Sequence, residues 1–205
     1  MIKSLLAAVA TALALCSAAG AATVVNTGTP DGQAVGAVAF DGVDWYAAQV
    51  SFAEASRIDA VLGHVLGGTA GETFTVSLYA DDASHLPGAV LYSGTAVFTA
   101  NGWNGLTGLG GWNVAAGDYW VGLEIQGADT LGAGSVTGAL LDQGAPSPLA
   151  RWAWDSTGGF GYDALGATSI GLRVDASAVP WPASGTLMLA GLALLAATTA
   201  RRRTR

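Results

Sequence analysis

The amino-acid sequence predicts an all-β domain, an antiparallel β-sandwich of jelly-roll type with about eight or nine strands. Two patterns predict this class. Apolar and polar residues alternate over short runs, and each run is bounded by Gly, Asn, Asp or Pro. In the same part of the chain, no stretch keeps a helical period for three turns. Apolar segments of a different kind flank the domain, and we expect a signal helix before it and a single transmembrane helix after it.

The first half of the domain contains three predicted strands and two further candidates. The clearest covers residues 73–79, where apolar side chains at even positions are expected to face inward and hydroxyl side chains at odd positions outward. Residues 57–66 are apolar on both parities, which is typical of a strand covered on both faces. Turn pairs such as Asp41-Gly42 separate the strands. The predicted strands are residues 46–52, 57–66 and 73–79, and the candidates are residues 24–27 and 34–40.

The second half of the domain continues the alternation. Residues 119–125 carry an inward apolar row at odd positions, with Trp120 and Glu124 on the opposite face. Residues 103–112 are rich in Gly, and their pattern predicts no clear element. Residues 127–134 and 158–166 are predicted loops. The predicted strands are residues 90–98, 119–125, 136–141, 149–154 and 170–174.

The domain, residues 23–178, is strongly acidic. All 15 acidic residues lie between Asp31 and Asp175, and only three of the eight basic residues lie in the same part of the chain. Three arginines against 15 carboxylates give a formal charge of −12. Such a surface repels phosphate backbones, so we expect no nucleic-acid partner. The only cysteine, Cys16, precedes the domain, so a core without disulfides must hold it together.

Residues 1–22 have the pattern of a secretory signal peptide. Lys3 precedes an apolar stretch at residues 5–15, and small residues follow it. One alternative is a buried N-terminal helix. Another is a lipoprotein signal at Cys16, although the bulky Leu15 occupies a position where such signals have a small residue. Export is the interpretation that the pattern favours.

The domain shows no recognisable catalytic motif. Gly-x-Ser-x-Gly, His-Glu-x-x-His and paired cysteines do not occur in its sequence. His64 shares its parity with Leu62 and Leu66 and is predicted to pack within a strand, whereas His85 is predicted to lie in a turn exposed to solvent. We therefore expect a protein that is not an enzyme. A secreted hydrolase using two carboxylates is the least favoured alternative.

Two adjacent carboxylates, Asp81 and Asp82, form the candidate metal site. Calcium takes oxygen ligands from carboxylates and loop carbonyls, and this pair lies in a turn before Pro87-Gly88. The alternative, favoured by the usual behaviour of Asp in turns, is a solvated turn without a metal. No other cofactor is predicted.

Three tryptophans are candidates for stacking on sugar rings: Trp120, Trp152 and Trp154. Trp152 and Trp154 are two residues apart, so on a strand they share a face. Trp120 is predicted to point away from the inward apolar row. An exposed indole binds the apolar face of a sugar, and exopolysaccharide is therefore a candidate partner. The alternative is that these side chains fill the core.

The C-terminal segment, residues 179–205, has three parts. A proline motif at residues 179–184 is followed by a predicted transmembrane helix at 185–200 and an arginine cluster at 201–205. Residues 183–200 form an 18-residue stretch without charge, close to the length of about 20 that spans a bilayer. The arginines are expected to stay cytoplasmic, with the domain outside. The defining residues are Val179, Pro180, Trp181, Pro182, Arg201, Arg202 and Arg203.

This order of parts resembles the PEP-CTERM sorting signal of Gram-negative bacteria. The resemblance implies recognition in the inner membrane by an exosortase, a cysteine-dependent transpeptidase-like enzyme that removes the tail. It also implies export in species that make an extracellular polysaccharide. Trp181 departs from the family pattern, which usually has Glu between the prolines. More loosely, the domain resembles the β-sandwich choice-of-anchor domains found ahead of such tails, through residues 73–79, 81–88, 119–125 and 170–174.

These features together predict a non-enzymatic exported protein of the cell surface or extracellular matrix. It is expected to be held in the inner membrane by its tail before processing by an exosortase. The alternative is a carbohydrate-binding module that tethers the cell to its exopolysaccharide.

Overall fold

Twelve β-strands and no helix occur in the part of the chain that the computed structural model describes, namely residues 21–30, 37–133, 139–141, 151–159, 161–165 and 170–179. The predicted all-β class is therefore confirmed. Ala21–Ser177 forms one compact unit. The expected signal and transmembrane helices fall on residues outside the described ranges. Within those ranges, no helix of the length and apolarity that a membrane crossing requires is found.

The strands largely follow the alternation of apolar and polar residues. Two differences stand out. The Gly-rich segment forms one long strand, β7, and a short strand, β11, lies in the predicted loop 158–166. The strands are β1 (Ala22–Asn26), β2 (Val38–Phe40), β3 (Trp45–Phe52), β4 (Ser56–Leu66), β5 (Thr73–Asp81), β6 (Pro87–Val97), β7 (Gly102–Val114), β8 (Gly117–Glu124), β9 (Ala139–Leu141), β10 (Trp152–Asp155), β11 (Asp163–Leu165) and β12 (Leu172–Ala178).

The glycines of β7 allow it to lie close against β4. The two strands pair from Ser56↔Val114 to Val65↔Gly102, with one irregularity between Ile58 and Ala60. Gly105 has a φ of 159°, and a Cβ there would lie 2.1 Å from the carbonyl oxygen of Val61. A side chain at this position is therefore excluded, because the backbone of β4 occupies its space. Gly105 is thus the glycine of this Gly-rich segment whose lack of a side chain the pairing with β4 requires.

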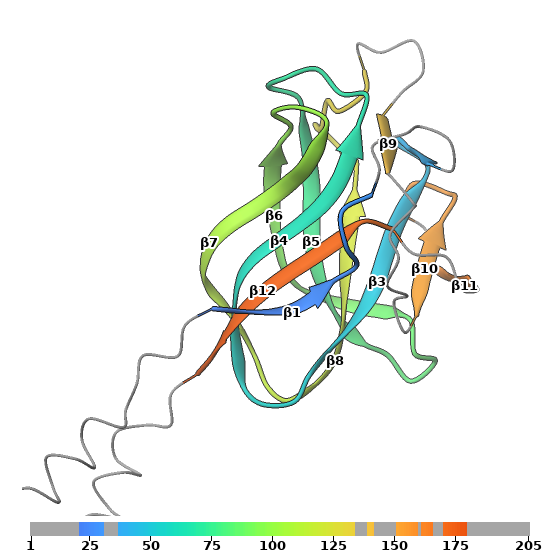
Figure 1. Ribbon diagram of the computed structural model, residues 1–205. Coiled ribbons are helices and arrows are strands. Elements are labelled where there is room, and N and C mark those ends of the chain that lie inside the picture. The colour runs from blue at the N-terminus through green and yellow to red at the C-terminus, as the bar shows by residue number, and fades with distance from the viewer. Residues whose placement is uncertain are drawn as a thin grey trace, which may run out of the picture. The chain divides into compact units, whose positions relative to one another are not determined.

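The strands form two antiparallel sheets, an arrangement consistent with a β-sandwich (Figure 1). Sheet I has the order β1-β12-β4-β9-β2, with β7 also paired to β4. Sheet II has the order β11-β10-β3-β8-β5-β6. Strands far apart in the sequence are neighbours in both sheets. In Figure 1, for example, β12 lies between β1 and β4.

Aromatic contacts join the two sheets across the core. Phe40 of β2 packs edge-on against Phe74 of β5, with ring centroids 5.9 Å apart. Tyr92 of β6 stacks on Trp112 of β7 at 5.5 Å. The apolar row predicted to face inward in residues 73–79 has no exposed surface. Burying one such side chain stabilises the fold by about 1.5–3 kcal/mol, and this term must suffice in a domain without cysteine.

Part of the outer face of sheet II, around Tyr79 and Trp120, is covered as well, contrary to the prediction. Ser77, placed by its parity in water, is 1% exposed, and Tyr79 on the same face is 7% exposed. Leu86 and Tyr162 pack against this face, in a second apolar cluster that includes Trp120. Leu86 follows β5 and Tyr162 follows β10, so the chain folds back over the sheet at two places. Strand alternation gives the face of a residue, but not what covers that face.

Candidate functional site

The polar side chains of the outer face of sheet II come together through strand register. Gln49 of β3 lies opposite Trp120 of β8, and Trp120 lies opposite Tyr79 of β5. Two residues further along β3, on the same face, Ser51 lies opposite Asp118, and its hydroxyl donates a hydrogen bond to Oδ1 of that carboxylate at 2.5 Å. Side chains directly opposite each other in antiparallel strands are close enough to interact. This face is therefore the candidate functional site.

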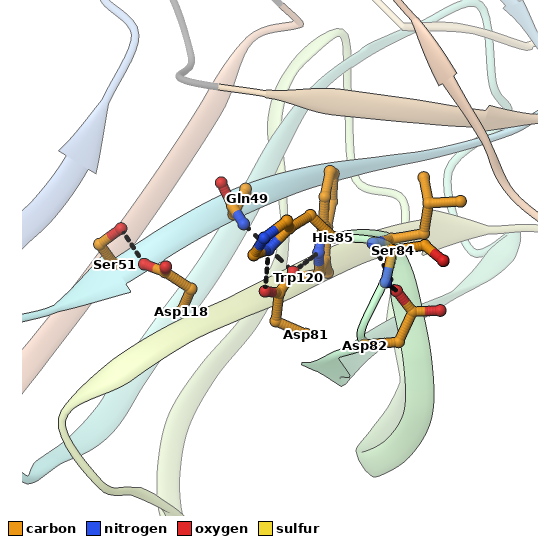
Figure 2. Close-up of polar contacts among 9 residues, drawn as sticks. Gln49, Ser51, Asp81, Asp82, Ser84, His85, Asp118 and Trp120 are labelled. Atoms are coloured by element: carbon orange, nitrogen blue, oxygen red, sulfur yellow. Dashed lines mark hydrogen bonds and ion pairs between the residues drawn. The ribbon is translucent and has the colours of Figure 1, made fainter.

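Asp81, the last residue of β5, is the centre of one cluster on this face (Figure 2). Its Oδ1 accepts hydrogen bonds from the indole N–H of Trp120 at 2.7 Å and from the side-chain amide of Gln49 at 3.2 Å. Its Oδ2 lies 2.7 Å from Nδ1 of His85. Burial acts to raise the pKa of Asp81, but these hydrogen bonds outweigh it and hold the pKa below its usual value. The carboxylate thus joins β3, β8 and the turn after β5.

The turn after β5 is organised by Asp82. Its Oδ1 accepts hydrogen bonds from the backbone N–H groups of Ser84 at 2.7 Å and Leu86 at 2.9 Å. His85 occupies the left-handed region, with a φ of 57°. It is the one residue other than glycine with positive φ in the described ranges. Such a conformation persists where surrounding contacts enforce it, and here the bonds of Asp81 and Asp82 do so.

These bonds bear on the predicted calcium site. Asp81 and Asp82 direct their carboxylates at different partners (Figure 2). In the described ranges, no group of three or more Asp, Glu, His or Cys side chains is placed to hold a metal ion. The geometry fits the alternative, an Asp-capped turn. Calcium binding by this pair stays a prediction that the geometry does not support.

A second cluster surrounds Glu124, which has no exposed surface. Its Oε1 accepts hydrogen bonds from the hydroxyls of Tyr79 and Tyr162, the latter at 2.5 Å. Its Oε2 accepts from the hydroxyl of Ser77 at 2.8 Å and from the side-chain amide of Gln126. Four donors therefore converge on one buried carboxylate. Such saturation is the condition under which a buried charge can be retained.

The two tyrosines of this cluster are held as donors. Burial raises the pKa of Tyr79 and of Tyr162 well above the usual value, and the adjacent charge of Glu124 raises both further. Both hydroxyls therefore stay protonated across the physiological pH range. Because Glu124 is enclosed on all sides, the arrangement serves as a buried acceptor that fixes the segments around it. The alternation of residues 119–125 placed Glu124 on the correct face. It could not predict that Tyr162, 38 residues later in the sequence, would cover that face.

The segment that brings Tyr162 over Glu124 is anchored by Asp155. This carboxylate, 1% exposed, accepts bonds at Oδ1 from the N–H and hydroxyl of Thr157, at 2.7 and 2.6 Å. Its Oδ2 accepts from the N–H groups of Gly159 and Gly161, each at 3.0 Å. Burial acts to raise the pKa of Asp155, but these bonds together hold it below the usual value.

The predicted sugar-stacking tryptophans are mostly covered. Trp120 is 1% exposed and Trp152 is 5% exposed, stacked on Tyr46 with ring centroids 5.6 Å apart. Trp154 shares the face of Trp152, as predicted, but that face is directed at the core. It is partly buried, and its indole N–H donates to Asp44 at 2.8 Å. Stacking needs an exposed ring, so the burial of Trp120 and Trp152 contradicts the position that the prediction required.

The Asp81–His85 pair is the nearest approach to a catalytic arrangement on this face. A hydrolase of the Ser-His-Asp type needs an attacking hydroxyl at the second ring nitrogen. Among the residues that the structure describes, Asp81 is the one hydrogen-bond partner of the His85 side chain. Ser84 is adjacent in sequence, but its backbone is held in the turn by Asp82. The pair holds the turn in place, and no attacking hydroxyl of the described residues is hydrogen-bonded to its second ring nitrogen.

The sorting residues lie at the C-terminal boundary of the described part. Val179 follows β12 directly and is 40% exposed. Pro180, Trp181, Pro182, Arg201, Arg202 and Arg203 lie outside the described residues. No protein-family model matches the chain, and no curated protein matches it.

Proposed function

We propose that the protein is a non-enzymatic exported protein of the cell surface or extracellular matrix, sorted and processed by an exosortase through its tail. The observation that carries the proposal is the order of parts in residues 179–205: a proline motif, an apolar stretch and an arginine cluster. An exported domain, an inner-membrane anchor and a cytoplasmic basic flank are what this order implies. We also propose that the domain is of jelly-roll type, since both sheets interleave strands from distant parts of the chain.

The position of the proline motif supports processing. Strand β12 ends at Ala178, and the motif begins at the next residue. Two prolines separated by one residue favour an extended backbone, which suits the cleft of a protease. Cleavage after such a segment would leave the strands of the domain intact.

The use of acidic side chains supports a structural role for the domain. Asp82 and Asp155 each accept hydrogen bonds from the backbone of a turn, and Glu124 is enclosed by four donors. Carboxylates engaged in this way hold loops on a scaffold. For the carbohydrate-binding alternative, Trp154 is the one of the three predicted stacking residues that is only partly buried.

The test is the intact mass of the exported protein recovered from its host. We expect a mass that lacks residues 1–22 and the arginine cluster, because processing removes both. In a Pro180→Ala, Pro182→Ala double variant, the full tail should remain attached and the protein should stay in the membrane fraction. Glu54→Gln, an exposed change in the domain, is the matched control and should be processed normally. An exported wild-type protein that retains Arg201–203 would contradict the proposal.

A further inference from the structure

Strand β6 forms an open edge of sheet II. It is the last strand in the sheet order, and among the described residues it pairs with β5 alone. Figure 1 shows β6 at the border of the sheet, on the side opposite β10 and β11. Alternate backbone N–H and C=O groups of such a strand point away from the sheet, where they can pair with another strand. An open edge therefore needs either a protecting feature or a partner.

The features that usually protect an edge strand are missing from most of β6. Edges are blunted by charged side chains, prolines or bulges. Between Pro87 and Gly117, however, the sequence has no charged residue. Pro87 lies at the start of β6, and the register shifts fall at Leu91 and before it, since Leu78 pairs with Tyr92 but Tyr79 with Val90. From Tyr92 to Val97, β6 pairs regularly with β5.

The outward face of this stretch carries uncharged side chains. Val97 is 50% exposed, and the hydroxyls of Ser93 and Thr95 are exposed beside it. Leu91, which is 42% exposed, is the bulged residue that borders the stretch. An uncharged edge with exposed branched side chains is the kind that adds a strand.

The sequence of β6 is complementary to itself in the antiparallel direction. If two copies pair with Gly94 at the centre, Leu91 of one copy lies opposite Val97 of the other, and Ser93 lies opposite Thr95. Apolar side chains thus meet apolar ones, and hydroxyls meet hydroxyls. On the inner face, the large ring of Tyr92 lies opposite the small Ala96. A two-fold contact requires such a match, because the same patch serves on both subunits.

The hydroxyl pairs would extend a row already present in the sheet. Ser77 of β5 lies opposite Ser93, with their oxygens 3.5 Å apart, and Thr75 lies opposite Thr95. Adding a second β6 continues this row across the interface. Cross-strand pairs of this type stabilise antiparallel sheets.

Charge favours the same contact over others. The domain carries a formal charge of −12, so two copies repel each other over most of their surface. Strands β6 and β7, which lie within the uncharged stretch, are the region where this repulsion is weakest. We propose that two copies of the chain associate through antiparallel pairing of β6 with β6, centred on Gly94, which joins the two copies of sheet II into one continuous sheet.

The test is sedimentation of the exported protein recovered from its host, from about 1 µM to 1 mM, a range suited to weak association. We expect the wild-type protein to pass from monomer to dimer within this range. Thr95→Lys places a charge at the centre of the edge and should weaken association at least about tenfold. Thr107→Lys is the matched control, because it puts the same charge at an exposed threonine of β7 and should dimerise like the wild type.

A second measurement does not depend on any variant. Amide hydrogen exchange in residues 91–97 of the wild-type protein should slow as concentration rises, while exchange in β7 should not change. A monomer at every concentration would overturn the proposal, as would dimerisation that Thr107→Lys disrupts and Thr95→Lys does not. Circular dichroism of each variant confirms that the fold is retained. Failure of this proposal would leave processing of the tail unaffected, so the two are tested separately.

Discussion

At the scale of single residues, the buried carboxylate of Glu124 is the most constrained group in the domain. Its two oxygens accept hydrogen bonds from four side chains, those of Ser77, Tyr79, Gln126 and Tyr162. Both tyrosine hydroxyls stay protonated because burial raises the pKa of each. The site therefore selects for an acceptor with two oxygens, and no side chain other than a carboxylate meets that requirement at this position.

Glu124→Gln tests this requirement. The new amide N–H₂ group faces donors at one of the two former oxygen positions, so at least one buried donor loses its acceptor. We expect the free energy of unfolding to fall by about 1–3 kcal/mol, measured by urea denaturation. Ser77→Ala, which removes one of four donors and leaves the carboxylate, should cost less, about 1 kcal/mol. A Glu124→Gln variant as stable as the wild type would show that the four donors do not require an ionised acceptor.

The face of Glu124 followed from its sequence, but its burial did not. Alternation in residues 119–125 placed Glu124 and Trp120 opposite the apolar row, and the structure confirms that they point away from the core. What covers them is Tyr162, which lies 38 positions later in the chain, between two short strands. Period-two alternation is a local signal, whereas cover depends on where a distant segment returns. The same reason explains why Trp120, placed on that face by the alternation, was a candidate for sugar stacking although it is buried.

At the scale of elements, the segment after β10 depends on one side chain. Asp155 accepts hydrogen bonds from Thr157, Gly159 and Gly161, and its pKa lies below the usual value because these bonds outweigh burial. A Cβ at Gly159 would lie 2.7 Å from the ring of Trp45, so the segment lies flat on the sheet. Short strands and a Gly-rich segment give little apolar burial here, and the carboxylate supplies the anchor.

The lowered pKa gives this anchor a defined pH dependence. A carboxylate whose pKa is lower in the folded state contributes stability that is fully present above its unfolded pKa, about 4, and that is lost as pH falls through the folded value. We expect exchange of the Thr157, Gly159 and Gly161 amides, taken relative to their intrinsic rates at each pH, to become faster below about pH 4. Asp155→Asn should show the fast exchange at neutral pH. Asp163→Asn, an exposed change in β11, is the control. Equal protection in wild type and Asp155→Asn at pH 7 would contradict the anchoring role.

At the scale of the whole molecule, the fold class was the property that the sequence predicted best. Which acidic side chains pair with a cation was the property that it predicted least. The all-β class followed from alternation and was confirmed, but β7 did not stand out, because its strand character comes from pairing with β4 rather than from its own Gly-rich sequence. Two arginine ion pairs in the described ranges each join residues that are two positions apart in the sequence. Arg57 pairs with Asp59 and Arg173 with Asp175, each within one strand. Such exposed pairs contribute little, so most of the charge of −12 is left without a partner cation.

This imbalance predicts that salt stabilises the domain. Carboxylates spread over one surface repel each other, and raising the ionic strength from 0.01 to 0.15 M shortens the Debye length from about 30 to about 8 Å. We expect the Tm at pH 7 to rise by a few degrees over this range, since about 1 kcal/mol corresponds to roughly 2–4 °C for a domain of this size. The measurement is thermal unfolding of the exported protein at a concentration where it is monomeric, so that salt acts on folding alone.

A matched variant separates repulsion from other effects of salt. Glu54→Gln combined with Asp163→Asn removes two exposed negative charges without touching the hydrogen bonds described above. The double variant should have a higher Tm at low salt and a smaller rise with salt, because less repulsion remains to be screened. If salt instead lowered the Tm of the wild type, attractive pairs would dominate the electrostatics of the fold. Repulsion between copies would then not favour contact at the uncharged β6 edge, and the self-complementary sequence of β6 alone would favour pairing there.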